Sequence, residues 1–439
     1  MKKMLALILT FSLAVTLAAC SGTPSAGDTG STGGNSAGGT SDGSAGTDSG
    51  TDSGTATTEI SGDLLIWFNN DDYAGAMIEA FNVKYPNVNV RYEKIDGLET
   101  AEKLSLEGPA GIGADVIWTA HDRFPVADGY IEPFPADAQA RIESLIIEAA
   151  IGTATHDGKL YGVPFQLDNV ALFYNKDIVP EPPATFEEII EFAGTYNDPA
   201  AGKYALRLSP NNSYANYIFL TAFGYSWFGP NRDDWKNPGF DSPEAARGLA
   251  YLKSLREIFD VDTADATYDF SFSSFDRGEV PFVINGPWGV AGAKNGGVNF
   301  GVAKIPTING VQPYAFSGTQ IIAVSSYSKN FDAAFAFAEF TVSEEGARIL
   351  YETLGVAATL KDVSGIPGLS EDEYLRGFME QAPFTHPQSS IPQMYLSWQP
   401  TITMMEFIWD GVLTIEEAQA KAMEDYELLL NTNGQSMFD

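Results

Sequence analysis

The chain changes character at about Glu59, and this boundary most constrains the fold. Before it, residues 21 to 58 are almost entirely Gly, Ser, Thr, Ala and Asp, with no aromatic residue. Such a segment buries too little apolar surface to offset the entropy that ordering would cost. From Glu59 to Asp439 roughly 380 residues follow, more than one hydrophobic core usually holds, so two lobes are expected.

The N-terminus has the pattern of an export signal that ends in a thiol. Two lysines precede an apolar stretch at 4–16, and small residues at 17–19 lead to Cys20, the only cysteine of the chain. This pattern resembles the lipobox of bacterial lipoproteins. The resemblance implies a signal peptide at 1–19, lipidation of Cys20 and anchoring at the extracellular face of the cell membrane, with 20–58 as a flexible linker. The alternative is an ordinary signal peptide in which Cys20 is incidental.

The single cysteine and the charge exclude several classes of protein. Without a second thiol the mature fold has no disulfide, so its stability must come from a core. There are 25 Lys and Arg against 58 Asp and Glu, a formal charge of -33, which opposes binding to nucleic acid. We interpret the acidity as favouring solubility rather than a cationic partner. Beyond residue 16, no apolar run reaches the length of about 18 residues that a transmembrane helix requires.

The start of the body alternates strand and helix patterns, which predicts an α/β lobe with a mostly parallel sheet. Ligands of such sheets bind outside the carboxyl ends of the strands, so the polar segments 69–72 and 120–123 are of interest. The predicted elements are strands at 63–68, 87–93 and 115–119 and a helix at 73–85.

Motifs of catalysis and metal binding are missing. GxxxxGK[ST], HExxH and CxxC do not occur, the three histidines are far apart, and no loop has the ligand spacing of an EF-hand. No cofactor, metal or catalytic residue is therefore predicted. The enzymatic possibility left open is glycoside hydrolysis by a pair of carboxylates.

Several strings in one order through the body resemble the maltose and maltodextrin-binding proteins of bacterial ABC importers. They lie at 64–67, 118–124, 172–177, 284–288 and 391–398. The resemblance implies a periplasmic-binding-protein-like clamshell of class α/β, whose two lobes have mostly parallel sheets and exchange strands through hinge segments. It also implies a first lobe of 59–166 plus 318–370 and a second of 167–317 plus 371–439. The protein would be a monomer that delivers sugar to permease subunits served by a separate ATPase.

Sugar-binding residues follow from the same resemblance. The stacking residues would be Tyr214, Trp288 and Trp398, the two tryptophans being expected in loops or at helix starts, whereas Trp67 and Trp118 are expected in the core. The matching polar contacts are Asp71, Ala120 through its backbone, Asp122, Arg123, Asp168 near the hinge and, more peripherally, Glu102. For Asp122, a helix N-cap is an equal alternative.

Four positions depart from the family pattern. Asp72 replaces a lysine, Thr119 a third stacking tryptophan, Asn212 a glutamate and Ile402 an arginine. One subsite is therefore expected to bind its sugar unit less tightly or to accept another sugar. The neighbouring aromatic residues considered as replacements for the lost ring are Phe68, Tyr73, Phe165 and Tyr217. The alternatives are a member of the same family for a different oligosaccharide and, more remotely, a cell-surface glycosidase or adhesive lipoprotein.

Overall fold

The computed structural model describes residues 60–123, 129–389, 391 and 393–437, with side chains up to residue 432. The signal peptide, Cys20, the linker 20–58, Glu59, Phe124 and Pro392 lie outside the described residues. The described residues form one compact unit. No described helix is both long and apolar enough to cross a bilayer.

Strands and helices alternate through most of this unit. The strands are β1 (Gly62–Phe68), β2 (Val88–Lys94), β3 (Val116–Ala120), β4 (Thr155–His156), β5 (Lys159–Leu160), β6 (Gly162–Asn169), β7 (Ala171–Asn175), β8 (Phe282–Asn285), β9 (Phe300–Ala303), β10 (Ala315–Val324) and β11 (Thr385–Pro387). The helices are α1 (Asp71–Lys84), α2 (Thr100–Glu107), α3 (Ala136–Leu145), α4 (Glu148–Ile151), α5 (Phe186–Tyr196), α6 (Ser213–Thr221), α7 (Pro243–Ser254), α8 (Tyr268–Asp276), α9 (Val290–Asn295), α10 (Phe331–Phe340), α11 (Glu344–Leu354), α12 (Glu373–Gln381), α13 (Gln393–Trp409) and α14 (Ile415–Met437). Short 3-10 helices include η1 (His121–Arg123) and η5 (Pro287–Gly289).

The first sheet begins with the βαβαβ arrangement that the sequence predicts. β1 lies between β2 and β3 and is parallel to both, and β10 then pairs antiparallel with β3. Asn70 caps α1 by accepting a hydrogen bond from the backbone N–H of Tyr73 at 2.9 Å, and α1 buries Tyr73, Met77 and Phe81. The four predicted elements are confirmed.

A first core surrounds this sheet and defines what we call the first lobe. Its buried residues come from 64–165 and 321–375. Trp67 and Trp118 lie within it, as expected. Trp118 is packed edge-on by Phe68, Tyr73 and Phe165, and all three of these rings are fully buried. These three rings are core residues in this structure and present no exposed face to a ligand.

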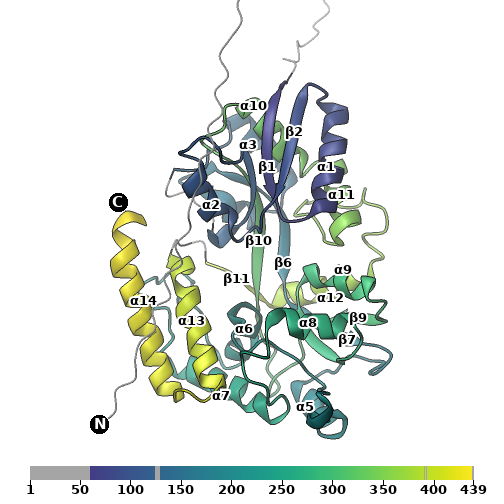
Figure 1. Ribbon diagram of the computed structural model, residues 1–439, viewed down its shortest axis with the longest axis vertical. Helices are drawn as coiled ribbons and strands as arrows, with labels where there is room; N and C mark the ends of the chain where they lie inside the picture. The colour runs from purple at the N-terminus through teal and green to yellow at the C-terminus, as the bar shows by residue number, and fades with distance from the viewer. Residues whose placement is uncertain (1–59, 124–128, 390, 392, 438–439) are drawn as a thin grey trace, which may run out of the picture. The chain divides into compact units, whose positions relative to one another are not determined.

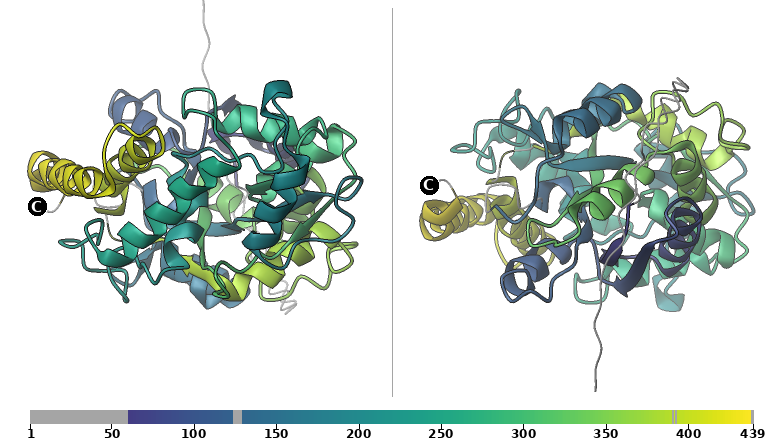
Figure 2. Two further views of the ribbon diagram at one scale, coloured as in Figure 1. Left: turned by 90° about the horizontal axis from the view of Figure 1, so that it is seen from below. Right: turned by 90° about the horizontal axis from the view of Figure 1, so that it is seen from above.

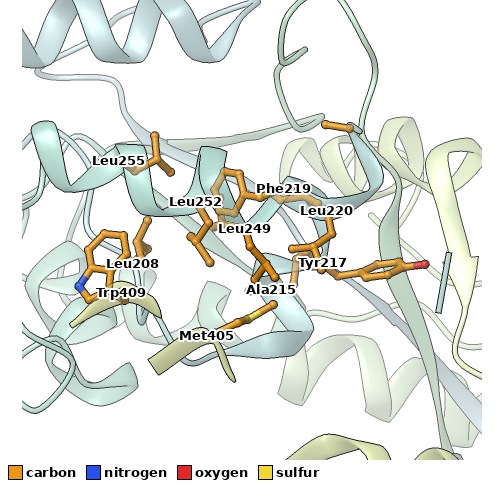
Figure 3. Packing of buried hydrophobic residues seen from close by; sticks show 14 of the residues in the cluster. Leu208, Ala215, Tyr217, Phe219, Leu220, Leu249, Leu252, Leu255, Met405 and Trp409 are labelled. Atoms are coloured by element: carbon orange, nitrogen blue, oxygen red, sulfur yellow. The ribbon is translucent and has the colours of Figure 1, made fainter. Parts of the chain in front are cut away.

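A second core, with buried residues from 170–316 and 394–426, defines the second lobe. Figure 3 shows α6, α7 and α13 contributing to it, and the labelled Tyr217 is fully buried. Tyr217 stacks on Phe316 with centroids 3.7 Å apart, so it is not a sugar platform here either. The opposite face of the second sheet is covered by a smaller cluster that includes Phe173, Phe300 and Phe378.

The second sheet corrects the prediction of mostly parallel sheets. β7 lies between β8 and β9 and is antiparallel to both. The reason is the chain path: β7 enters the second lobe directly after β6, with Val170 between them, while β8 and β9 run in the opposite direction. The α/β class itself is confirmed, and the first sheet contains both parallel and antiparallel pairs.

Two adjacent strands join the lobes. β10 pairs with β3 through 320–324 and with β11 through 315–317, while β6 pairs with it along 162–169. Figure 1 shows β10 and β6 running from the region of β1 and β2 to that of β7 and β9. In both views of Figure 2 the yellow helices α13 and α14 lie side by side at one edge of this unit, in keeping with their mutual contacts.

Candidate functional site

The segment after β3 links the two lobes through hydrogen bonds. The indole Nε1–H of Trp398, on α13, donates to Asp122 Oδ2 at 2.7 Å. The neighbouring His121 accepts from the backbone N–H of Thr319 at 3.2 Å, and its other ring nitrogen lies 3.4 Å from the carbonyl oxygen of Gln388. Asp122 thus lies in a 3-10 helix facing α13, and its carboxylate holds a second-lobe indole.

Trp398 differs from its expected position. It lies inside α13, not in a loop or at a helix start, and only 9% of its surface is exposed. Its ring packs against Trp227 and Phe316, with centroids 5.2 and 5.9 Å away. Because Trp398 is largely covered in this structure, a ligand would reach little of the ring unless the segments around it move.

Tyr214 and Trp288 form the aromatic part nearest the hinge strands. Tyr214, on α6, directs its hydroxyl toward the carbonyl oxygens of Asp168 and Phe316, at 3.4 and 3.5 Å. Burial, together with the nearby carboxylates Asp168 and Asp122, raises the pKa of Tyr214 well above its ordinary value. The Tyr214 and Trp288 rings lie 6.3 Å apart.

Trp288 is more exposed to solvent than Tyr214 and Trp398. It lies in η5 with 44% of its surface exposed, and its Nε1–H donates to the Tyr268 hydroxyl at 2.5 Å. A Cβ added at Gly286 would lie 2.2 Å from the Trp288 ring, so only glycine allows the indole to fold back over the chain here. Trp288 is therefore an exposed ring whose orientation is fixed, and its place in a short 3-10 helix agrees with the expected loop or helix-start position.

Asp168 is a buried carboxylate in the hinge strand β6, with 4% exposure. Gln166 and Gln320 donate their Nε2–H groups to its two oxygens, at 2.5 and 2.9 Å. Gln320 is held in turn by Trp118, whose Nε1–H donates to Gln320 Oε1 at 2.7 Å. Burial, partly offset by the two glutamine hydrogen bonds, raises the pKa of Asp168 to about 6.

Arg123 makes weaker contacts than Asp122. Its Nη1–H donates to the carbonyl oxygen of Leu98 at 3.5 Å, and its guanidinium carbon lies 5.3 Å from the ring centroid of Tyr395. Its Nε atom is buried without a hydrogen-bond partner among the described residues. Arg123 therefore has hydrogen-bonding capacity that the protein uses only in part.

The remaining sequence candidates are divided between exposed and structural positions. Asp71 is exposed and accepts from the Tyr92 hydroxyl at 3.1 Å and from Lys94 Nζ at 2.6 Å, and these two hydrogen bonds lower its pKa. Glu102 is exposed on α2. Asn212 caps α6 by accepting from the backbone N–H of Ala215 at 3.1 Å.

Thr119 and Ala120 end the buried strand β3, and the Thr119 side chain has no exposed surface. Among the departures, Asp72 is exposed on α1 and Ile402 is half-buried on α13. The structure thus brings Asp122, Asp168, Tyr214, Trp288 and Trp398 into one network. Asp71 and Asn212 make their hydrogen bonds with residues outside this network.

Sequence reasoning missed four residues that shape this network. Phe316 stacks with Tyr214 at 5.7 Å and packs on Trp398, Tyr268 orients Trp288, Gln320 holds Asp168, and Tyr395 faces Arg123. The apolar run that becomes β10 signals only a strand for Phe316 and Gln320. Tyr395 lies inside a string quoted for the family resemblance, which is the one signal that pointed to its neighbourhood.

The chemistry of the network suits a polyhydroxylated ligand with flat apolar faces. Carboxylates and amides can bind hydroxyl groups, and aromatic rings can pack against C–H surfaces. In the part of the chain that the structure describes, no three or more His, Cys, Asp or Glu side chains are grouped as metal ligands would be.

Comparison with known proteins identifies relatives over most of the body. The family model for bacterial extracellular solute-binding protein matches residues 76–376. A maltotriose-binding protein of Pyrococcus abyssi is 31% identical over 77% of this chain and 75% of its own length. A galactooligosaccharide-binding protein of Bacillus subtilis is 27% identical, with 82% and 88% covered. A maltooligosaccharide ABC transporter solute-binding lipoprotein of Streptococcus pneumoniae is 27% identical, with 80% and 83% covered.

A solved structure shares the fold. The crystal structure of a cyclo/maltodextrin-binding protein complexed with maltotetraose matches with a TM-score of 0.72 and 30% identity. The match covers 84% of this chain and 97% of that one. These findings confirm the resemblance and the periplasmic-binding-protein fold.

Proposed function

The chain belongs to the family of bacterial extracellular solute-binding proteins, and we propose that it captures maltose and maltodextrin-type oligosaccharides for an ABC importer. The observation that carries this proposal is the Asp122 to Trp398 hydrogen bond between the lobes, beside Tyr214 and Trp288. Two relatives whose names refer to maltotriose and maltooligosaccharide, and a structural neighbour that holds maltotetraose, support the sugar class.

Binding would couple to closure of the two lobes. The proposed lobes are 59–166 with 318–370 and 167–317 with 371–439, and the two main core clusters support this division, apart from Leu375, which packs in the first core. A sugar that contacts η1 of the first lobe and Trp288 of the second binds the closed state more tightly than the open state. That difference in affinity shifts the population toward closure.

The protein would work as a monomeric receptor at the extracellular face of the membrane. Lipidated Cys20 would hold it there through the linker, and permease subunits with a separate ATPase would receive the sugar. The lipoprotein among its relatives supports this location. We assign no catalytic role to Asp122 and Asp168, since the named relatives are binding proteins.

A titration tests the proposal. The purified body is titrated with maltose, maltotriose, longer maltodextrins and cyclodextrins while tryptophan emission is followed, with galactooligosaccharides and unrelated oligosaccharides as comparison ligands. Because Trp288 and Trp398 lie in the network, an α-1,4-glucan should change the emission and saturate. The absence of a response to every α-1,4-glucan at millimolar concentration contradicts the proposal. Release of new reducing ends during the incubation would instead indicate a glycosidase.

A second candidate is a different oligosaccharide. The full burial of Thr119 at the position of the third stacking tryptophan favours it, as does the galactooligosaccharide-binding relative. In the same titration, a response confined to another oligosaccharide would establish this alternative.

A further inference from the structure

Thr119, which stands where the family pattern has a third stacking tryptophan, cannot contact a sugar in this structure. Thr119 has no exposed surface and lies opposite Ile321 in the pairing of β3 with β10. Phe68, Tyr73, Phe165 and Tyr217, the four aromatic residues considered as replacements, are fully buried as well. A sugar unit that needs another ring must therefore contact one from a different part of the chain.

Tyr395 presents such a ring next to η1. It lies in the first turn of α13, 42% of its surface is exposed, and the guanidinium carbon of Arg123 lies 5.3 Å from its ring centroid. Residues three positions apart on a helix are neighbours on its surface, which places Tyr395 beside Trp398. Two consecutive residues of η1 thus contact two neighbouring residues of α13: Asp122 holds Trp398, and Arg123 faces Tyr395.

The Arg123 guanidinium beside this ring has N–H groups that can donate hydrogen bonds to a ligand. A guanidinium carries five N–H donors, and among the described residues Arg123 uses one of them, in a long hydrogen bond of 3.5 Å to Leu98. A cation next to an aromatic ring also restrains the orientation of that ring. The pair combines an exposed apolar face with hydrogen-bond donors, as a sugar unit requires.

We propose that Tyr395, oriented by Arg123, forms a further stacking subsite for a sugar unit beyond those bound at Tyr214, Trp288 and Trp398. The inference rests on the proposed function, because it assumes an oligosaccharide in the neighbouring network. Only a chain long enough to reach α13 gains from this ring. The subsite therefore selects for chain length, favouring maltotetraose and longer chains over maltose.

The test compares two sugars on the full folded body. In Tyr395→Ala, the affinity for maltotetraose should fall about 10-fold, which corresponds to the loss of one partly buried ring, while the affinity for maltose stays within about twofold. Tyr395→Phe keeps the ring and should retain both affinities. Tyr327→Ala removes a tyrosine of the first lobe with 37% exposure and serves as the matched control, with no selective loss expected. Thermal unfolding of each variant checks that it is folded.

Each outcome of this comparison supports or overturns the proposed Tyr395 subsite. A loss confined to maltotetraose supports the subsite. Equal losses for both sugars, or an unchanged affinity for maltotetraose, overturn it while leaving the proposed function intact. If wild-type protein bound neither sugar, the proposed function itself would fail, and the subsite would fail with it.

Discussion

The two lobes contribute different chemistry to the candidate site. The first lobe and the hinge strand β6 provide Asp122, Arg123 and Asp168, whereas the second lobe provides Tyr214, Trp288 and Trp398. Groups that are able to bind hydroxyls thus come mainly from one side and flat apolar rings from the other. Because a buried sugar needs both, neither lobe alone offers a complete site, and ligand binding should depend on both at once.

Substitutions of the second-lobe aromatic residues should cause the largest loss of sugar affinity. Replacing Trp288 and Trp398 together by alanine should weaken binding by about 100-fold or more, because each lost ring removes on the order of 1 to 3 kcal/mol. Isothermal titration with a maltodextrin measures it. Since Trp398 packs on Trp227 and Phe316, its truncation can also lower stability, so Trp288→Ala alone and Trp398→Phe are measured as better-tolerated variants. Trp235→Ala, at a second-lobe tryptophan with 38% exposure, is the matched control. Unchanged affinity in the double variant would show that the site is misplaced.

The contribution of the first-lobe polar residues to sugar affinity is tested at Asp122. Asp122→Ala removes the acceptor of the Trp398 indole and a proposed sugar ligand, so we expect affinity to fall by roughly 10-fold. A double-mutant cycle with Trp398→Phe separates the direct contact from the orientation of the ring. Full additivity of the two changes would mean that the hydrogen bond between the lobes does not position Trp398 for binding.

Asp168 should show opposite effects on binding and stability. Burial raises the folded pKa to about 6, above the unfolded value of about 4, so ionisation at pH 7 costs stability. Asp168→Asn should therefore raise the free energy of unfolding at pH 7 by roughly 1 to 2 kcal/mol while weakening sugar binding. The stability difference should shrink as the pH falls from about 7 to 4, because wild type then becomes protonated too. Urea unfolding across this range measures it, and a difference independent of pH would contradict the assignment.

The smallest effect is expected at Asp71, which the family resemblance places in the sugar site. Its carboxylate is exposed and paired with Lys94 and Tyr92, and exposed ion pairs contribute little, so Asp71→Asn should change sugar affinity by less than about twofold. The same titration measures it, with Asp63→Asn as an exposed control on β1. A tenfold loss would show that Asp71 reaches the ligand in a closed state and that the polar side is larger than this structure indicates.

The sequence predicted the start of the first lobe well because its elements have local signals. Alternating apolar residues mark β2, helical spacing marks α1, and the Trp67 and Trp118 strands are continuous apolar runs. The direction of the second sheet had no such signal. Short apolar runs such as β8 and β9 identify strands but do not say whether a neighbour is parallel.

The candidate site could be predicted in its residues but not in their environments. The family strings located Asp122, Trp288 and Trp398, and the assignment of sugar contacts to them stays a prediction. Burial could not be read in advance: Trp398 is covered by Phe316, which lies 82 positions away in the chain, so no local pattern indicates the contact. The burial of Tyr217 has no local signal for the same reason, since its stacking partner is also Phe316.

Strand β10 also sets an order for folding. The first sheet needs it beside β3, yet about 200 residues of chain separate the two strands, and most of the second lobe lies between them. Ile321 and Ile322 are fully buried, so the first core stays incomplete until this strand arrives. A ribosome must therefore synthesise most of the protein before the first-made strands can complete their sheet, and the two lobes should acquire full stability together and late.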